Sequence, residues 1–176
     1  LRPSGAYYPQ GFSPGQLLLT DRFHRAFPGG TGSAKFAGNY AAVRMAERFA
    51  KKFGAQQVLY LDQANRFLEE AGAMNHYHVT KDGGVIIPEF RDTILKSITS
   101  MSMLALEDRL EHPVRQERIP VKQFIEQVQA GEIREAGGFG TAASVAPIGN
   151  YLMDLKSRKP TQNVRREDLG NLVVWN

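Results

Sequence analysis

Short apolar runs, bounded by turns that contain glycine or proline, alternate along this chain of 176 residues with segments in which apolar residues recur every three or four positions. The short runs predict buried or half-buried strands, and the three- and four-residue spacing predicts amphipathic helices. Because strands and helices alternate without an internal repeat, the pattern indicates a single mixed α/β domain. The predicted strands cover residues 16–20, 57–61, 74–80 and 85–88, and the predicted helices run from Asn39 to Gly54, from Thr99 through Leu110, and from Pro120 to Gly131.

Two glycine-rich stretches separate these elements. Residues 27–35 form a glycine-rich loop that ends in a lysine. Residues 137–143 predict a turn that leads into the apolar residues 145–148. Near the carboxyl end the pattern weakens, and residues 173–175 are the remaining strand candidate.

The composition is that of a globular protein with a sizeable core, because 42% of the residues are hydrophobic and 23% are charged. The apolar runs are too short to span a membrane, and the absence of cysteine fits a reducing compartment. The net charge is +4, but Lys and Arg are interleaved with Asp and Glu and form no basic patch beside exposed aromatic residues. We therefore expect a cytoplasmic protein that binds neither nucleic acid nor membranes.

Lys35 closes the first glycine-rich loop, a position that raises the question of phosphate binding. The nucleotide-binding loop requires Gly immediately before its lysine and Ser or Thr immediately after it. Ala34 and Phe36 flank Lys35, so that motif is excluded. A lysine held partly out of water becomes a usable amine nucleophile. The alternative is a surface lysine, which the loop alone favours because most lysines are exposed.

Glu70 follows another acid, Glu69, at the point where an apolar segment meets a turn of small residues. A buried carboxylate requires a cationic partner, and a protonated pyridine nitrogen would serve. The alternative is a pair of surface charges, which is again the simpler interpretation of the local sequence. Residues 97–100 offer hydroxyl and backbone N–H groups at a predicted helix start, which suits either an anion site or an ordinary helix cap.

His76 and His78 alternate along one predicted strand and therefore face the same side of it. A metal site requires further ligands, and neither an acid nor a third histidine accompanies this pair. We predict that the chain holds no metal.

Taken together and in this order, these residues resemble the branched-chain amino-acid aminotransferases, which are fold-type IV enzymes that use pyridoxal 5′-phosphate. The resemblance runs from about Ser4 to Gly149, and its first stretch, residues 25–42, is long and specific. It implies an α/β fold, namely the mixed α/β barrel-like large domain of the D-amino-acid aminotransferase-like pyridoxal-phosphate enzymes. The other matching stretches are Gln57–Asp62, Glu69–Asn75, Asp92–Thr99 and Gly140–Ala143.

The resemblance implies a role for each matching residue. Lys35 would form the Schiff base with pyridoxal 5′-phosphate and shuttle the substrate's proton, and Tyr40 would hydrogen-bond the phenolic oxygen of the cofactor. Glu70 would pair with the pyridine nitrogen and keep it protonated. The other implied roles are phosphate binding by Ile98, Thr99 and Thr141, binding of the substrate carboxylate by Thr141 and Ala142, and a wall of the side-chain pocket at Tyr7.

Three features depart from the family pattern. Family members carry a small domain before the position where this chain begins, so we expect residues 1–150 to be the cofactor-binding large domain without it. The phosphate segment usually reads Leu-Pro-Gly-Ile/Val-Thr-Arg, whereas Lys96 and Ser97 stand here in place of Pro and Gly. Residues 151–176 lack the family's last helix, and we expect them to be a short, atypical carboxyl-terminal segment.

The function that the resemblance implies is transfer of an amino group between branched-chain L-amino acids and 2-oxoglutarate by a homodimer, with small amino-acid and 2-oxo-acid substrates. The glycine run 29–32 and the pair Asn39-Tyr40 favour this group over two enzymes of the same fold, D-amino-acid transaminase and aminodeoxychorismate lyase. A further alternative is a truncated, catalytically inactive remnant that acts as a binding module.

Overall fold

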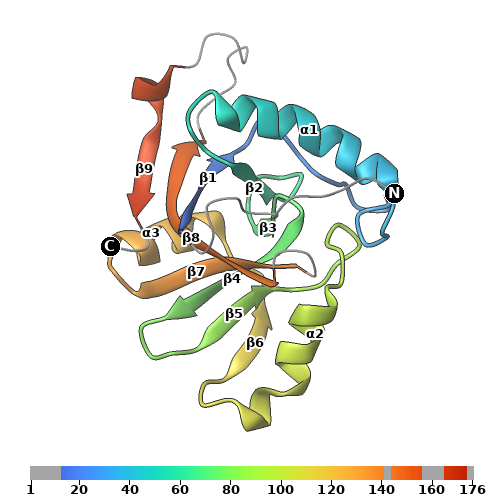
Figure 1. The fold of residues 1–176 in the computed structure, drawn as a ribbon, viewed down its shortest axis with the longest axis vertical. Helices are drawn as coiled ribbons and strands as arrows, with labels where there is room; N and C mark the ends of the chain where they lie inside the picture. The colour runs from blue at the N-terminus through green and yellow to red at the C-terminus, as the bar shows by residue number, and fades with distance from the viewer. Residues whose placement is uncertain (1–12, 141–143, 156–164, 174–176) are drawn as a thin grey trace.

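The computed structural model describes residues 13–140, 144–155 and 165–173 of the chain. In this part of the chain a nine-stranded sheet curls on itself, and helices pack against it (Figure 1). The strands β3-β2-β1-β8-β7-β4 pair in that order, and a further pairing between β3 and β4 closes them into a ring. This closed sheet confirms the predicted mixed α/β barrel-like fold. The strands of the ring are β1 (Gly15–Thr20), β2 (Gln57–Leu61), β3 (Leu68–Ala71), β4 (Met74–Thr80), β7 (Ile133–Gly140) and β8 (Ser144–Asp154).

The ring meets the rest of the sheet at β4. One edge of β4 pairs with β7, and β3 and β5 (Val85–Pro88) share the other edge. Near the start of β4, Asn75 lies opposite Glu70, and near its end His78 lies opposite Ile86. The sheet therefore forks at β4, with Glu70 and Asn75 on the ring side of the fork. The strands outside the ring are β5 (Val85–Pro88), β6 (Val114–Glu117) and β9 (Gly170–Val173).

The alternation of side chains along the strands divides the core between the two faces of the sheet. Leu18 packs in one cluster with Phe49 of helix α1 (Ala37–Lys51), whereas its neighbour Leu19 packs in another with Phe124 of helix α3 (Val121–Gln129). Helices α1 and α3 thus each bury an apolar stripe against one face of the sheet. The helices are α1 (Ala37–Lys51), α2 (Ile98–Ala105) and α3 (Val121–Gln129), with 3-10 helices at Glu107–Arg109 and Arg166–Asp168.

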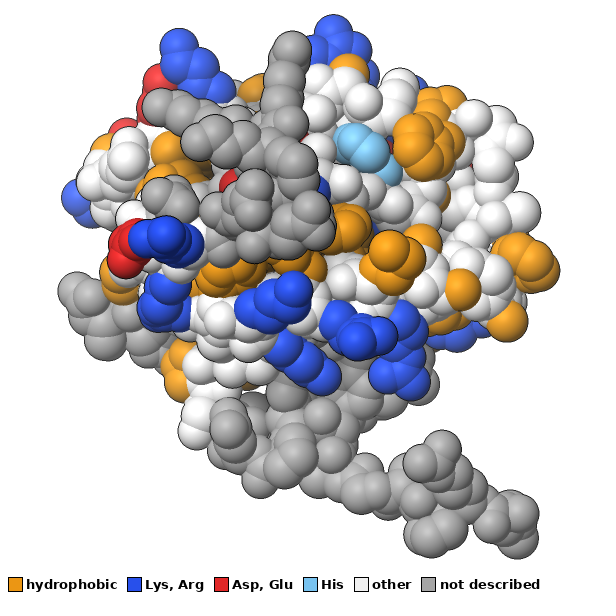
Figure 2. All heavy atoms as spheres, turned by 90° about the horizontal axis from the view of Figure 1, so that it is seen from above, with side chains coloured by type: hydrophobic (Ala, Val, Ile, Leu, Met, Phe, Trp, Pro, Cys, Tyr) orange, Lys and Arg blue, Asp and Glu red, His pale blue; other side chains and the backbone are white. Residues whose placement is uncertain are grey.

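The face of α1 that points to solvent is basic. Arg44, Arg48 and Lys51 are exposed on this helix, while Val43 and Phe49 are buried. Figure 2 looks onto this end of the molecule and shows Lys and Arg side chains interspersed with exposed hydrophobic and uncharged ones. Among the described residues, no helix is both long enough and apolar enough to cross a membrane.

Most of the predicted elements are confirmed. Strands β1, β2, β4 and β5 cover the predicted strands, and α1 and α3 cover two of the three predicted helices to within a few residues. Gly54 and Gly131 follow the ends of these helices with φ values of 85° and 68°, in the left-handed region that favours glycine. Pro120 is the N-cap of α3, one residue before the helix itself.

The helix predicted from Thr99 through Leu110 is wrong at both ends. Its N-cap is Ser97, whose hydroxyl accepts a hydrogen bond from the backbone N–H of Ser100. Because Ser97 already satisfies a donor of the first turn, the helix begins before the predicted cap. It ends at Ala105, and a separate 3-10 helix follows.

The turn predicted over residues 137–143 is wrong in its first part, because Gly137 to Gly140 belong to β7. A Cβ on Gly137 would lie 2.5 Å from the ring of Tyr77. Tyr77 in turn stacks on Phe139, with ring centroids 4.2 Å apart. Glycine here makes room for aromatic packing on a strand and does not mark a turn.

The sequence pattern does not predict β3 or β6, which are each four residues long and carry charged residues. Glu69 and Glu70 lie in β3, and Arg115 and Glu117 lie in β6, so neither strand shows an apolar run. Strand β8 is longer than the predicted apolar stretch and passes through residue 150 without a break.

Candidate active site

Glu70 is a buried acid in β3, with 3% of its surface exposed. Its Oε1 accepts hydrogen bonds from the backbone N–H of Leu95 at 2.6 Å and from Nδ2 of Asn75 at 3.4 Å. Burial raises the pKa of Glu70 to about 7, although Arg25 and the Leu95 hydrogen bond favour its ionised form. Glu70 is therefore not the surface charge that its local sequence favours.

Arg25 supplies a cation beside this acid. Its Nε lies 3.0 Å from Oε2 of Glu70. The N–H at Nε does not point at that oxygen, so the contact is an ion pair and not an aligned hydrogen bond. Nη2 of Arg25 donates to the carbonyl groups of Gly32 and Thr93. Arg25 is not among the predicted site residues, and the need of a buried carboxylate for a cation is the signal that could have found it.

The glycine-rich loop is fastened to the segment that precedes α2. Gly32 lies so close to Thr93 that a Cβ on Gly32 would be 2.6 Å from Cα of Thr93. The N–H of Ser33 donates to the carbonyl of Asp92 at 2.7 Å. These contacts, with those of Arg25, fix the loop against the segment that also carries Leu95.

Asn39, in the first turn of α1, holds the end of the same loop. Its Nδ2 donates to the carbonyl groups of Thr31 at 2.7 Å and Ala34 at 3.0 Å, and its Oδ1 accepts from the hydroxyl of Thr31 at 2.7 Å. Asn39 is buried. It therefore fixes the backbone immediately before Lys35, a positioning role that the sequence does not reveal.

Lys35 and Tyr40 lie together where the loop meets α1. Nζ of Lys35 is 5.2 Å from the centroid of the Tyr40 ring, a cation–π distance. Lys35 is exposed in the described structure, so the described residues do not desolvate it as the nucleophile hypothesis supposes. Its charge nevertheless lowers the pKa of Glu70, which indicates that the two side chains lie within electrostatic range.

Asn75 connects Glu70 to the first turn of α2. Its Nδ2 donates to the carbonyl of Leu95 at 2.9 Å as well as to Glu70, and its Oδ1 accepts from the hydroxyl of Ser100 at 2.9 Å. Asn75 and Ser100 are both buried. The buried acid and the helix start are thus held in one hydrogen-bonded network.

The first turn of α2 presents backbone N–H groups. The hydroxyl of Ser97 accepts a hydrogen bond from the backbone N–H of Ser100 at 3.3 Å. Ser97 is one of the departures from the family pattern. Ile98 is 69% exposed and Thr99 is half-buried, and neither backbone N–H makes a hydrogen bond within the described residues. Unpaired N–H groups at the positive end of a helix are suited to an anion.

Three predicted site residues, Tyr7, Thr141 and Ala142, lie outside the described residues. The strand that precedes Thr141 is β7, in which Phe139 lies opposite Asn75. The described part of the chain therefore brings together Lys35 with Tyr40, and Glu70 with the first turn of α2.

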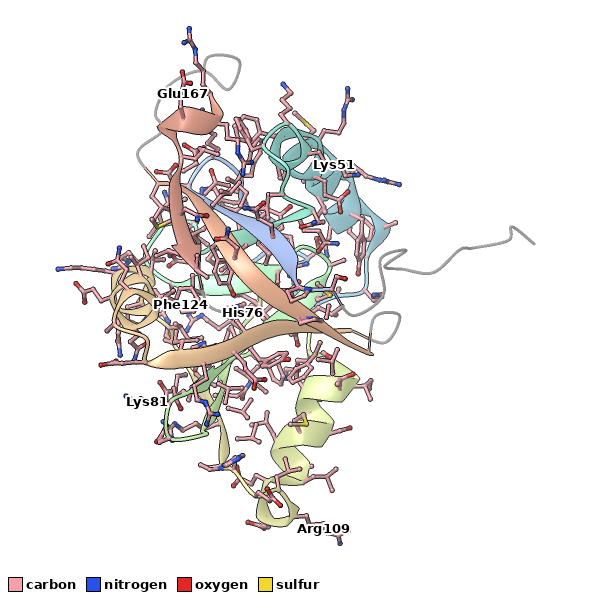
Figure 3. The ribbon with its side chains drawn as sticks, turned by 60° about the vertical axis from the view of Figure 1, so that its left-hand side comes forward. Lys51, His76, Lys81, Arg109, Phe124 and Glu167 are labelled. Carbon is pink, nitrogen blue, oxygen red and sulfur yellow. The ribbon has the colours of Figure 1, made fainter. Side chains whose placement is uncertain are left out.

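His76 and His78 are buried among aromatic rings and belong to the core. Figure 3 shows His76 and Phe124 in the interior, and their ring centroids are 5.6 Å apart. Nε2 of His76 shares a hydrogen bond of 2.8 Å with the hydroxyl of Tyr151. Burial lowers the pKa of both histidines, that of His78 to about 4. Within the described residues, no three His, Asp or Glu side chains are grouped so that they could hold a metal ion.

Comparison with known proteins identifies the family. Residues 12–151 match the family described as amino-transferase class IV. This chain belongs to the class IV aminotransferases. The match covers most of the chain and includes every described residue of the candidate site.

The similar curated proteins are branched-chain-amino-acid aminotransferases. The probable enzyme of Staphylococcus aureus (strain N315) is 41% identical over 151 residues, which are 85% of this chain and 42% of that protein. The enzyme of Mycolicibacterium smegmatis is 39% identical over 152 residues, which are 84% of this chain and 41% of that protein. The chain thus spans less than half the length of these relatives.

Solved structures of the same kind share the fold. The branched-chain amino acid aminotransferase of T.th. complexed with 4-methylvaleric acid aligns with a TM-score of 0.65 at 28% identity, over 80% of this chain and 44% of that one. The same protein with pyridoxamine 5′-phosphate aligns with a TM-score of 0.66 at 27% identity, over 86% and 46%. The resemblance found in the sequence is confirmed.

Proposed function

We propose that this chain is the cofactor-binding part of a pyridoxal 5′-phosphate-dependent aminotransferase that moves amino groups between branched-chain L-amino acids and 2-oxoglutarate. The observation that carries the proposal is the network that ties the buried acid Glu70 through Asn75 to Ser100 in α2. This network sets a fixed separation between an acid and a helix start that presents unpaired N–H groups. The loop that ends in Lys35 is fastened to the same segment through Thr93.

The residues of the site fit pyridoxal 5′-phosphate group by group. The amine of Lys35 suits its aldehyde, and the carboxyl group of Glu70 suits its pyridine nitrogen. The unpaired N–H groups of Ile98 and Thr99 suit its phosphate. Tyr40, beside Lys35, would donate to its phenolic oxygen. When bound, the cofactor supplies an electron sink for the charge that develops at the α-carbon of the amino acid.

Glu70 would stabilise a proton on the pyridine nitrogen. A carboxyl group with a pKa of about 7 can be ionised near neutral pH, and Arg25 at 3.0 Å favours the ionised form. The ionised carboxylate then stabilises a positive charge on the nitrogen that faces it. In this scheme Arg25 is a positioning residue that acts through Glu70.

Nζ of Lys35 would remove the proton from the substrate's α-carbon and later return it. A general base must lie within hydrogen-bond reach of the proton that it abstracts. Asn39 supports this requirement because it holds the carbonyl of Ala34, the residue before Lys35. The lysine side chain can therefore move while its backbone stays fixed.

The substrates are proposed from the relatives. The T.th. protein was solved with 4-methylvaleric acid and, at 29% identity to this chain, with N-(5′-phosphopyridoxyl)-L-glutamate. We further propose a cytoplasmic homodimer in which residues 1–150 bind the cofactor and residues 151–176 form a carboxyl-terminal segment. Thr141 would bind both phosphate and substrate carboxylate, Ala142 the substrate carboxylate, and Tyr7 would line the side-chain pocket.

Titration of the purified chain with pyridoxal 5′-phosphate tests the proposal. We expect a visible absorption band of bound cofactor that Lys35→Ala abolishes. Lys51→Ala, a change of an exposed lysine at the far end of α1, is the matched control and should retain the band. Borohydride reduction followed by peptide mapping should find the cofactor's mass on the peptide that contains Lys35. A parent chain without the band, or a band that survives in Lys35→Ala, would contradict the proposal.

The choice of substrate is tested on a protein that includes this chain and shows aminotransferase activity. Leucine with 2-oxoglutarate should be converted, whereas D-alanine and aminodeoxychorismate should not. Preferential conversion of D-alanine or aminodeoxychorismate would instead favour the alternative enzymes of this fold.

A further inference from the structure

A cavity of about 140 Å³ lies between the β2–β3 connection, the ends of β5 and β6, and the segment that precedes α2. Neither Lys35 nor Glu70 lines this cavity, although Glu69, the neighbour of Glu70 in β3, does. Because a cavity needs about 10–15 Å³ to hold one water, this one has room for several waters or for a small molecule. The proposed aminotransferase chemistry does not use it.

Most charged side chains that line the cavity are paired. Asp62 lies 3.8 Å from Nη2 of Arg118. Glu89 lies 3.4 Å from Nη1 of Arg91. Glu117 pairs at 2.7 Å with an arginine outside the cavity. These pairs leave one lining acid and one lining cation that form no ion pair among the described residues.

Glu69 is that acid, and it is 3% exposed. Its Oε1 accepts a hydrogen bond from the hydroxyl of Thr93 at 2.5 Å, whereas its Oε2 has no hydrogen-bond partner within the described residues. A buried polar atom without a partner costs free energy that a ligand's donor would recover. Glu69 lines the cavity, and the terminal torsion of glutamate is soft, so a small rotation of the carboxylate can bring an oxygen toward a ligand's donor there.

Arg66 is the lining cation, and no ion pair involves it within the described residues. It is exposed, and its guanidinium carbon lies 5.7 Å from the centroid of the Phe67 ring. The guanidinium of Arg118 lies on the same ring at 3.7 Å. The aromatic ring therefore orients guanidinium groups at the cavity without neutralising Arg66.

We infer that this cavity binds a free α-amino acid, with the ammonium group on Glu69 and the carboxylate on Arg66. One unpaired acid and one unpaired cation match the two charges of a zwitterion, and a guanidinium can bind a carboxylate through two parallel N–H groups. Phe67, Leu68 and Ile94 offer apolar surface for an aliphatic side chain. A purely cationic ligand would leave Arg66 unpaired, and a purely anionic ligand would leave Glu69 unpaired.

Thr93 places the cavity next to the candidate active site. Its hydroxyl binds Glu69, and its carbonyl accepts a hydrogen bond from Arg25, the partner of Glu70. An amino acid in the cavity would therefore contact the network that holds Glu70. The inference does not depend on the proposed function, because it concerns the chain without its cofactor.

Titration calorimetry of the chain without pyridoxal phosphate, with L-leucine as the probe, tests this inference. We expect saturable binding that Glu69→Gln and Arg66→Met each weaken by about tenfold or more, because each variant loses a charge-assisted hydrogen bond. Glu89→Gln is the matched control, since Glu89 lines the cavity but is exposed and already paired, and it should change the affinity by less than about threefold. Lys35→Ala should leave leucine binding unchanged.

Two analogues separate the two charges. 4-Methylvaleric acid lacks the amine, so Glu69→Gln should not weaken its binding, and isoamylamine lacks the carboxylate, so Arg66→Met should not weaken its binding. The inference fails if leucine does not saturate, if Glu69→Gln binds like the parent, or if inorganic phosphate displaces leucine as well as leucine does itself. If Glu69→Gln does not fold, Arg66→Met, a change of an exposed side chain, decides the question.

The absorption band of bound cofactor should persist in both variants, so this inference and the proposed function can fail separately.

Discussion

Arg25 and Glu70 form an ion pair that is almost wholly removed from solvent: Nε of Arg25 lies 3.0 Å from Oε2 of Glu70, and each side chain is 4% exposed. Desolvation offsets much of the attraction in such a pair, but the loss of one partner leaves the other buried and unpaired. Arg25 also binds the carbonyl group of Gly32 in the loop and that of Thr93 in the segment before α2, so the pair connects the fold of the loop to the charge of the acid.

Arg25→Met should therefore destabilise the fold and neutralise Glu70 together. We expect the free energy of unfolding to fall by about 3–5 kcal/mol, and the pKa of Glu70 to rise because Arg25 lowers it. Urea unfolding measures the first effect, and the pH dependence of cofactor binding measures the second. Arg91→Met is the matched control, because its pair with Glu89 is 47% exposed on both sides and should contribute less than about 1 kcal/mol. Equal losses in the two variants would refute the prediction.

Gly32→Ala should loosen the glycine-rich loop from the segment before α2. The added Cβ would lie 2.6 Å from Cβ of Ala26 and 2.7 Å from the carbonyl oxygen of Thr93, so the backbone must shift. We expect a loss of about 1–3 kcal/mol in the free energy of unfolding and weaker binding of pyridoxal 5′-phosphate in the absorbance titration. Gly15→Ala is the control, because its nearest neighbours lie at 3.7 Å, an ordinary contact distance. A Gly32→Ala protein as stable as Gly15→Ala would show that the loop is not held at this point.

Much of the fold could be predicted because α1, α3 and four strands show the periodicity of elements with one buried face. Strand β3 could not, because its two acids interrupt the apolar pattern and only its pairing with β2 and β4 buries them. Strand β7 could not be predicted for another reason. Its glycines are typical of a turn, and the contact with the ring of Tyr77 that explains Gly137 forms only once β7 pairs with β4.

The candidate site also has a part that the local sequence predicts and a part that depends on contacts with distant segments. The local sequence favours a surface position for Glu70, and the residues that bury it, Arg25, Asn75 and Leu95, come from three other segments of the chain. Only the resemblance to a known family selected Glu70 from the sequence. Lys35, by contrast, is exposed as the local sequence favours. Its proposed role therefore rests on the family resemblance, and the cofactor titration tests it.

Ser100→Ala should uncouple Glu70 from α2. The change leaves Oδ1 of Asn75 without its hydrogen bond in a buried position, which costs about 1–3 kcal/mol. We expect a lower urea midpoint and weaker binding of pyridoxal 5′-phosphate, because the acid and the helix start would no longer be held at a fixed separation. Ser102→Ala, an exposed serine of the same helix, is the control and should be close to neutral. If Ser100→Ala bound the cofactor as tightly as the parent chain, the hydrogen-bonded network would not contribute to cofactor binding.

Glu70 should make the fold less stable as the pH rises from 4.5 to about 7. Burial raises its pKa from 4.5 to about 7 in the folded chain, so over this range the folded state retains a proton that the unfolded state has released. The contribution of Glu70 to the free energy of unfolding therefore falls as the pH increases. Urea unfolding of Glu70→Gln at several pH values should lack this component. If the free energy of unfolding depended on pH in the same way in the parent and in Glu70→Gln, this pH dependence could not be assigned to Glu70.

His78 should act in the opposite direction and favour unfolding in acid. Burial lowers its pKa from 6.5 to about 4, so below pH 6.5 the unfolded state binds a proton that the folded state does not. The difference between 6.5 and 4 corresponds to about 3 kcal/mol, lost progressively as the pH falls through this range. His78→Leu removes the titrating ring, and we expect its free energy of unfolding to depend less on pH below 6.5. His76, whose pKa is also lowered, should retain part of the dependence.

Phe124→Leu separates this titration from packing. The ring of Phe124 lies 5.5 Å from that of His78, so the variant loosens the same region of the core without removing a titratable group. It should lower the free energy of unfolding by about 1–2 kcal/mol and retain a dependence on pH below 6.5, because both histidines are still present to titrate. If the pH dependence of the parent persisted fully in His78→Leu or disappeared in Phe124→Leu, the loss of stability in acid would have to come from groups other than this buried histidine.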